Sequence, residues 1–177
     1  MNLNLLEGKT AIVTGGTRGI GFAIVKTYLE NGAKVSLGGS RQETVDKALA
    51  KLREENPDYP VMGITPDLSD FDSITAEFNK VKEAFGSIDI LGNNAGVSAR
   101  ESIYEYDPEA FKQTMELNVN AAFLCCRAVA PIMKEQGGGV IINTSSMVSI
   151  YGQPSGCAYP TSKFAINGLT KSLGREL

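Results

Sequence analysis

Short apolar runs alternate along the chain with longer amphipathic stretches, and this alternation predicts strands and helices in regular succession. The runs predicted as buried strands are residues 9–14, 34–37, 61–65, 88–91 and 140–143. The predicted helices are 19–31, 42–55, one beginning at Ser69, one beginning at Asp107 that includes the strongly apolar stretch 119–133, and one from Tyr159 to Leu177. Such a succession is typical of right-handed crossovers between parallel strands, with helices on both faces of the sheet. The predicted fold is a doubly wound α/β sheet.

Capping residues support several of these boundaries. Gly32 follows the first predicted helix, where a left-handed glycine commonly ends a helix. Ser69 offers a hydroxyl cap with an acid three residues later, and Asp107-Pro108 gives a cap followed by proline in the first turn. The tripled glycine at 137–139 ends the apolar helix. Since no linker or repeat interrupts the pattern, residues 1–177 are predicted to form a single domain.

Composition excludes several classes of partner and of chemistry. The net charge of −3 gives no electrostatic reason to expect nucleic acid or an anionic membrane. No apolar run approaches the roughly 20 residues of a membrane span, and the N-terminus does not resemble a secretory signal, so the predicted location is cytoplasmic. The sequence contains no histidine, which excludes Ser-His-Asp hydrolysis and histidine-ligated metals within this chain. Cys125, Cys126 and Cys157 lack metal-type spacing and are predicted to be buried, reduced thiols; no metal site is predicted.

A glycine-rich turn follows the first predicted strand, at residues 14–21 (TGGTRGIG). In a doubly wound sheet, the turn after the first strand is the usual phosphate site, because glycine allows close approach and the next helix presents free N–H groups. The spacing differs from the G-x-G-x-x-G fingerprint, and the turn lacks the lysine of a P-loop, which argues against an ATPase or GTPase. The turn predicts dinucleotide binding; the alternative is a tight corner between strand and helix.

The end of the second predicted strand bears on the cofactor. An enzyme that prefers NAD usually places an acid there for the ribose hydroxyls, but residues 37–41 (LGGSR) contain none. Arg41, Ser40 and Arg18 offer donors suited to a 2′-phosphate. The sequence therefore predicts NADP (NADPH) rather than NAD; the alternative is that both arginines are solvated surface residues.

Tyr159 and Lys163 stand four residues apart on a predicted helix, so they share one face. A free phenol has a pKa of about 10, and a nearby ammonium lowers it toward the range that acid–base catalysis needs. Ser146 follows the fifth predicted strand and thus emerges at the same edge of the sheet. A tyrosine–lysine pair by itself is weak evidence, and Pro160 disfavours helical geometry at Tyr159, so the prediction depends on the whole set of residues.

Taken together, these motifs resemble the short-chain dehydrogenase/reductase family. Four signatures occur in the family's order: residues 14–21, 93–96 (NNAG), Asn118 within LNV, and Ser146 with 159–163 (YPTSK). The resemblance runs from about Leu6 to the last residue. It implies a Rossmann-type, three-layer α/β/α fold.

The resemblance also implies the roles of individual residues. Tyr159 would be the acid–base, Lys163 would tune it and bind the nicotinamide ribose, Ser146 would orient the carbonyl, and Asn118 would hold a water in a proton relay. Asp67 would meet the adenine. The full expected cofactor site comprises Gly15, Thr17, Arg18, Gly19, Ile20, Gly21, Ser40, Arg41, Asp67, Leu68, Asn94, Ala95, Gly96, Tyr159 and Lys163.

The resemblance implies an NADP-dependent enzyme that interconverts a ketone and a secondary alcohol. The first expectation is a 3-oxoacyl-[acyl-carrier-protein] reductase-like activity; a hydroxysteroid or sugar dehydrogenase, or a non-catalytic NAD(P)-binding protein, are the alternatives. Family members are commonly homodimers or homotetramers. They also continue beyond the equivalent of Leu177 with further strands and a substrate-covering segment, so we expect this chain to be C-terminally incomplete and to turn over poorly alone.

Overall fold

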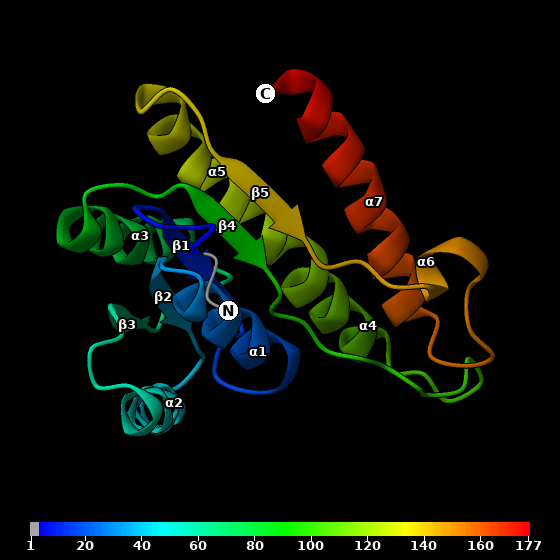
Figure 1. Cartoon of the computed structure of the whole chain (residues 1–177). Coiled ribbons are helices and arrows are strands. Elements are labelled where there is room, and N and C mark those ends of the chain that lie inside the picture. The colour runs from blue at the N-terminus through cyan, green and yellow to red at the C-terminus, as the bar shows by residue number, and fades with distance from the viewer. Residues whose placement is uncertain (1–3) are drawn as a thin grey trace.

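Five parallel strands form one sheet in the order β3-β2-β1-β4-β5 in the computed structural model, which describes residues 4–177 (Figure 1). The strands are β1 (Thr10–Val13), β2 (Lys34–Gly38), β3 (Val61–Ile64), β4 (Ile90–Asn93) and β5 (Val140–Asn143). The chain begins in the middle of the sheet, winds outward to β3 and then returns to build β4 and β5 on the other side of β1. This topology confirms the prediction of a doubly wound, Rossmann-type sheet.

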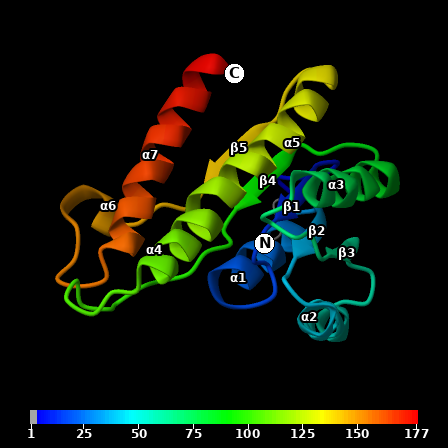
Figure 2. The same ribbon diagram turned by 180° about the vertical axis from the view of Figure 1, so that it is seen from behind.

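Helices cover both faces of this sheet (Figures 1 and 2). On one face, α1 (Gly19–Glu30) and α2 (Gln42–Glu55) bury Val25 and Val45 against β1 and β2. On the other face, α3 (Phe71–Phe85) and α5 (Ala121–Glu135) bury Phe78 and Val129 against β1 and β4. The remaining helices are α4 (Pro108–Met115), the π-helical turn η1 (Glu116–Asn120), α6 (Val148–Tyr151) and α7 (Ala158–Glu176). These two apolar layers hold the parallel strands in place, so that the carboxyl ends of all five strands lie at the same edge of the sheet.

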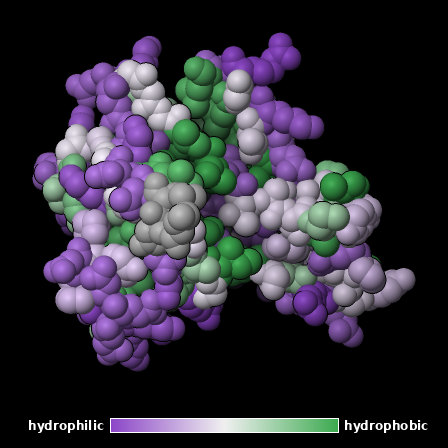
Figure 3. Space-filling view, in the orientation of Figure 1, coloured by the Kyte–Doolittle hydropathy of each residue, from purple (hydrophilic) through white to green (hydrophobic). Residues whose placement is uncertain are grey.

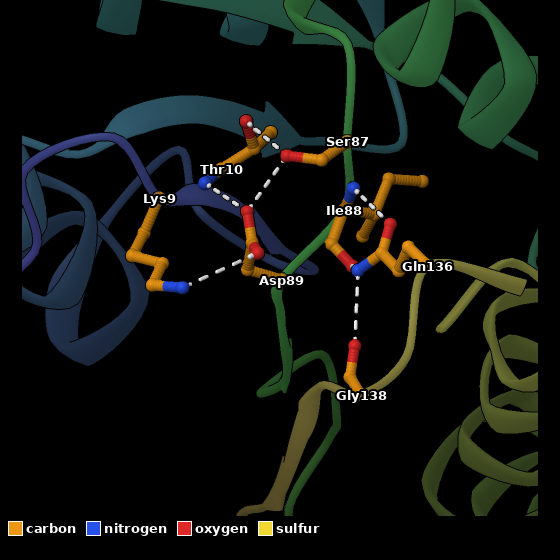
Figure 4. Close-up of polar contacts among 7 residues, drawn as sticks. All are labelled: Lys9, Thr10, Ser87, Ile88, Asp89, Gln136 and Gly138. Atoms are coloured by element: carbon orange, nitrogen blue, oxygen red, sulfur yellow. Dashed lines mark hydrogen bonds and ion pairs between the residues drawn. The ribbon is translucent and has the colours of Figure 1, made fainter. Parts of the chain in front are cut away.

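Asp89 secures the opposite, amino-terminal end of the sheet (Figure 4). Its Oδ2 accepts hydrogen bonds from the Thr10 backbone N–H at 2.9 Å and from Ser87 Oγ at 2.7 Å, and Lys9 Nζ lies 3.7 Å from its Oδ1. Partial burial by itself would raise the pKa of the Asp89 carboxyl, but the donors outweigh this effect and hold the pKa below its usual value. The carboxylate therefore joins the starts of β1 and β4.

Some sequence-based boundaries were wrong. The α3 cap is Asp70, which accepts from the Asp72 N–H, rather than Ser69. The fourth strand begins at Ile90, and the predicted apolar helix is interrupted by the π-helical turn η1 before α5 begins at Ala121. The short helix α6 was not predicted. Of the three cysteines, Cys125 and Cys126 are buried as predicted, but Cys157 is exposed.

Strand β5 lies at the edge of the described sheet, and one of its faces is uncovered. Val140 and Ile142 are 53% and 48% exposed, and Figure 3 shows apolar side chains gathered over this strand. Within residues 4–177, no helix combines the length and hydrophobicity that crossing a membrane requires.

Candidate active site

The turn between β1 and α1 is packed so tightly that it requires glycine at two positions. Gly15 has φ +64°, a left-handed conformation that favours glycine, and a Cβ there would lie 2.9 Å from Ala95 Cα. A Cβ on Gly21 would lie 2.8 Å from the carbonyl carbon of Gly15 and 2.6 Å from Asn94 Nδ2. The backbone of the turn therefore folds directly onto the start of α1 and onto the segment after β4.

Thr14 and Asn94 hold these two segments together. The Thr14 Oγ1 accepts from the backbone N–H groups of Asn94 and Ala95, both at 3.1 Å. In return, Asn94 Nδ2 donates to the carbonyl oxygens of Thr14 at 3.3 Å and Gly15 at 3.2 Å. This reciprocal bracing fixes the glycine turn relative to the carboxyl end of β4.

A cleft of about 920 Å³ opens above the carboxyl ends of the strands. Its walls come from the glycine turn, from the ends of β2 and β3, from the segment after β4, and from α4 with η1. Twelve of the predicted cofactor residues line it: Gly15, Thr17, Arg18, Gly19, Ile20, Gly21, Ser40, Asp67, Leu68, Asn94, Ala95 and Gly96. Arg41, by contrast, is an exposed residue at the start of α2 and does not line the cleft.

The residues of this cleft fit a dinucleotide. The α1 N-terminus has no side-chain cap, so its first N–H groups stay available to an anion. The exposed Asp67 carboxylate lines the wall and is held by Ser69, whose Oγ and N–H both donate to it and lower its pKa. Of these cleft-lining residues, Arg18 is the only cationic one and Asp67 and Glu116 are the acids. The shape of the cleft and the uncapped helix thus suit a phosphate-bearing ligand, and Arg18 supplies a cation for it.

Tyr159 and Lys163 lie on one face of α7. The Lys163 ammonium is 5.7 Å from the centroid of the Tyr159 ring, and it donates to the Thr144 carbonyl just after β5 at 2.7 Å. Lys163 is 5% exposed, and burial lowers the pKa of its ammonium. A Cβ on Gly96 would be 3.9 Å from Lys163 Nζ, so the lysine reaches the segment that lines the cleft.

Asn118 is buried in the π-helical turn η1. Its Oδ1 accepts from the Val97 N–H at 2.8 Å, and its Nδ2 donates to the Val97 carbonyl at 2.9 Å and to Ser162 Oγ at 3.0 Å. Single π turns occur frequently at functional sites. Here the turn aims one amide at both the segment after β4, at Val97, and helix α7, at Ser162.

Ser146 lies between β5 and α6, on the same stretch of chain as Thr144. Its carbonyl accepts from both the N–H and the Oγ of Ser149, at 3.0 and 2.6 Å. Its own Oγ accepts only a long 3.4 Å bond from the Val148 N–H, so its proton remains free to donate. The structure thus brings Tyr159, Lys163, Asn118 and Ser146 to one end of the sheet, although none of the four lines the main cleft.

Comparison with known proteins identifies the family. Residues 9–177 match the short chain dehydrogenase family. The chain belongs to that family. It is therefore an oxidoreductase of the kind that acts on CH–OH groups, in a family that binds NAD or NADP.

Several individual members of the family are similar to this chain over nearly its whole length. The chain is 65% identical over 173 residues to a 3alpha-hydroxysteroid dehydrogenase of Mediterraneibacter gnavus, covering 98% of this chain and 69% of the relative. It is 33% identical over 174 residues to the 3-oxoacyl-[acyl-carrier-protein] reductase FabG of Chlamydia muridarum, covering 98% and 70%. The crystal structure of gox2181 superposes with a TM-score of 0.92 at 30% identity, covering 99% of this chain and 70% of that one. The chain thus spans about two thirds of these relatives' length.

Several polar residues near the site were missed by sequence reasoning. Ser162 joins Asn118 to the Tyr159 carbonyl, and Ser145, Ser149 and Asn167 form a hydrogen-bonded group behind Ser146. Asn167 stands four residues after Lys163, and this helical spacing was the only signal that could have placed it on the same face.

Proposed function

We propose that this protein is an NADP-dependent hydroxysteroid oxidoreductase in which Tyr159 exchanges the proton of the substrate oxygen. One observation carries the proposal: the buried Lys163 ammonium lies 5.7 Å from the centroid of the Tyr159 ring and also reaches Gly96, in the segment that lines the cleft. A fixed positive charge beside a phenol favours the phenolate, which is what a tyrosine needs to act as an acid–base near neutral pH.

Each residue has a separate task in this mechanism. A bound nicotinamide cofactor would supply or accept the hydride at the reacting carbon. In the reductive direction, Tyr159 gives its proton to the ketone oxygen, and Ser146, whose Oγ proton is free, donates a hydrogen bond to the same oxygen. In the oxidative direction, the phenolate of Tyr159 takes the alcohol proton. Lys163 stabilises the phenolate, and Asn118 positions α7 through Ser162.

The hydroxysteroid substrate class is supported by the 65% identity with the 3alpha-hydroxysteroid dehydrogenase of Mediterraneibacter gnavus. Thioesters of 3-oxoacyl chains, the first expectation from the sequence, have weaker support because the FabG relative is 33% identical. A non-catalytic role is disfavoured by the presence of all four residues at one end of the sheet.

The test measures NADP reduction with a 3α-hydroxysteroid, and NADPH oxidation with a 3-oxoacyl thioester, on the wild type and on Tyr159→Phe. We expect slow turnover with the steroid, as for a chain that turns over poorly alone, and a further loss of about 10²- to 10⁴-fold in kcat when the phenol is removed. Tyr59→Phe, which removes a hydroxyl remote from the cleft, is the matched control and should keep full activity. Wild-type turnover on the thioester alone would refute the steroid proposal, and an active Tyr159→Phe would refute the mechanism.

The preference for NADP rests on charge. Arg18 and Ser40 line the cleft, no acid occupies residues 37–41, and the exposed Arg41 stands at the adjoining start of α2. A charge-assisted hydrogen bond contributes about 1.5–3 kcal/mol, so Arg41→Ala should weaken NADP binding by about 10- to 100-fold and leave NAD binding unchanged. The dissociation constants of both cofactors should be measured by fluorescence titration. Equal affinity of the wild type for NAD and NADP would contradict this preference.

Three broader inferences complete the proposal: residues 1–177 act as one NAD(P)-binding domain, the protein is cytoplasmic, and it associates as a homodimer or homotetramer. Phe123 on α5 and Phe164 on α7 are 47% and 49% exposed, which supports association through these long helices. Light scattering after size-exclusion chromatography measures the mass directly, and a monomer at micromolar concentration would contradict association.

A further inference from the structure

A closed group of hydrogen bonds ties the loop that carries Ser146 to helix α7. It consists of Ser145, Ser149 and Asn167, which we call the Asn167 clamp. Ser145 Oγ lies 2.7 Å from Asn167 Oδ1, Asn167 Nδ2 lies 2.9 Å from Ser149 Oγ, and Ser149 Oγ lies 2.6 Å from the Ser146 carbonyl oxygen. All three residues are at least partly buried, and Ser149 is 4% exposed.

The number of available protons decides which group donates and which accepts in each of these hydrogen bonds. Each serine hydroxyl has one proton. Ser149 must donate its proton to the Ser146 carbonyl, which can only accept, and must therefore accept from Asn167. The Asn167 amide then directs its Nδ2 at Ser149 and its Oδ1 at Ser145, which donates. Asn167 acts as donor on one side and as acceptor on the other, a combination that an aspartate of the same shape does not offer.

The clamp acts on Ser146, the proposed hydrogen-bond donor to the substrate oxygen. The Ser146 carbonyl receives two donors, the N–H and the Oγ of Ser149, while the Ser146 hydroxyl has only a long contact of its own. Orientation of the Ser146 side chain thus depends on its backbone, and the backbone depends on the clamp. Lys163 provides the neighbouring tie, from the same helix to the Thr144 carbonyl at 2.7 Å.

We propose that Asn167 is a positioning residue that fixes Ser146 relative to Tyr159 through Ser149. This inference rests on the proposed function of Ser146 as the hydrogen-bond donor to the substrate oxygen. Helix α7 would then carry three residues at successive turns: the acid–base Tyr159, the cation Lys163 beside it, and Asn167, which anchors the segment that contains Ser146. A misplacement of about 1 Å in a reacting group can cost on the order of 100-fold in rate.

The kinetic test is a double-mutant cycle between Asn167→Asp and Ser146→Ala. Asn167→Asp should lower kcat by about 10- to 100-fold while the KM and the dissociation constant for the cofactor stay unchanged. In the Ser146→Ala background, the same substitution should change kcat by less than about twofold, because no hydroxyl remains to be positioned. Ser149→Ala removes only the hydroxyl that links Asn167 to the Ser146 carbonyl, and should lower kcat in the same way. This variant replaces Asn167→Asp in the test if the aspartate variant folds poorly.

Thr170→Val is the matched control. It removes a hydroxyl bonded to Asn143 further along α7, and should leave kcat within about twofold of the wild type.

Hydrogen exchange provides a readout that requires no substrate. In Asn167→Asp, the N–H groups of Ser149 and Ile150, which donate to the carbonyls of Ser146 and Met147, should exchange at least about tenfold faster, while the N–H groups within α5 stay as in the wild type. Unchanged exchange at Ser149, or additive effects of Asn167→Asp and Ser146→Ala on kcat, would overturn the positioning role alone. A Ser146→Ala variant with wild-type kcat would overturn both this inference and the proposed role of Ser146.

Discussion

Replacing Gly21 with alanine tests the glycine turn most directly. The new Cβ would lie 2.8 Å from the Gly15 carbonyl carbon and 2.6 Å from Asn94 Nδ2, and still closer to the Gly15 oxygen. Ordinary contacts of this kind begin near 3.4 Å, so the turn and the start of α1 must separate by several tenths of an ångström or more. Neither neighbour can rotate away, because one is backbone and the other is held by hydrogen bonds to Thr14 and Gly15.

Overpacking of this kind costs about 1–3 kcal/mol, and most of that cost should appear as lost cofactor affinity, because the N–H groups of the turn would move relative to the phosphates. We expect NADP to bind about 10- to 100-fold more weakly to Gly21→Ala, measured by fluorescence titration. Gly92→Ala makes the same chemical change nearby in β4, where the nearest atom would be 3.6 Å away, and should bind NADP as the wild type does. If Gly21→Ala binds NADP within twofold of the wild type, the turn does not determine the phosphate site.

Three further predictions concern stability and reactivity. Gly168→Ala, in the interior of α7 with no atom within 4 Å of the new Cβ, should raise the free energy of unfolding by about 0.5–1 kcal/mol in urea titrations. Asp89→Ala should lower that free energy at pH 7 by about 1–3 kcal/mol. Because the folded-state pKa of Asp89 is held below its usual value, this contribution is complete above the ordinary pKa of about 4 and is lost as the pH falls through the folded value. The stabilities of wild type and variant should therefore converge once the pH is below the folded pKa. A disulfide reagent at pH 8 should label Cys157 first, since burial raises the pKa of Cys125 to about 12 and that of Cys126 to about 11; rapid labelling of all three thiols in the native protein would contradict their burial.

The sequence predicted those elements whose apolar pattern is local. Helix α2 and strand β5 have the bounds expected from the sequence, because each is delimited by its own periodicity and by flanking glycine or polar residues. The doubly wound parallel sheet was predicted from the alternation of strands and helices and from the rule that crossovers are right-handed. The order of the strands within the sheet was not predicted.

Other features were determined by contacts that a local pattern does not contain. Ser69 has the right chemistry for a helix cap, but its hydroxyl donates to Asp67, and so Asp70 caps α3 instead. The π-helical turn η1 was not predicted, because its residues continue a helical pattern in the sequence. Only the three-dimensional contacts show its effect, which is to direct the Asn118 side chain at Val97 and Ser162. The exposure of Cys157 likewise depends on the turn that precedes α7.

For the proposed catalytic residues, too, local spacing could be predicted from the sequence and long-range contacts could not. The spacing of Tyr159 and Lys163 was sufficient to place them on one face, since a single helix sets their separation. It did not show that the lysine would reach Thr144 on another element, a contact that joins residues 19 positions apart in sequence. Roles that depend on such contacts could be suggested only by the family resemblance.

Helix α7 explains why these long-range contacts matter together. Tyr159, Lys163 and Asn167 follow one another at intervals of four residues, and the two downstream residues each hold the strand-to-helix segment that contains Ser146, at Thr144 and at Ser149. Because a helix is stiff over two turns, the position of the Tyr159 ring relative to that segment is set by how these two side chains are anchored. Loosening the Asn167 anchor would leave every proposed catalytic group present in the chain but displaced from the others. Loss of rate without loss of cofactor binding is therefore the result expected from damage at Asn167, whereas Lys163 also belongs to the expected cofactor site.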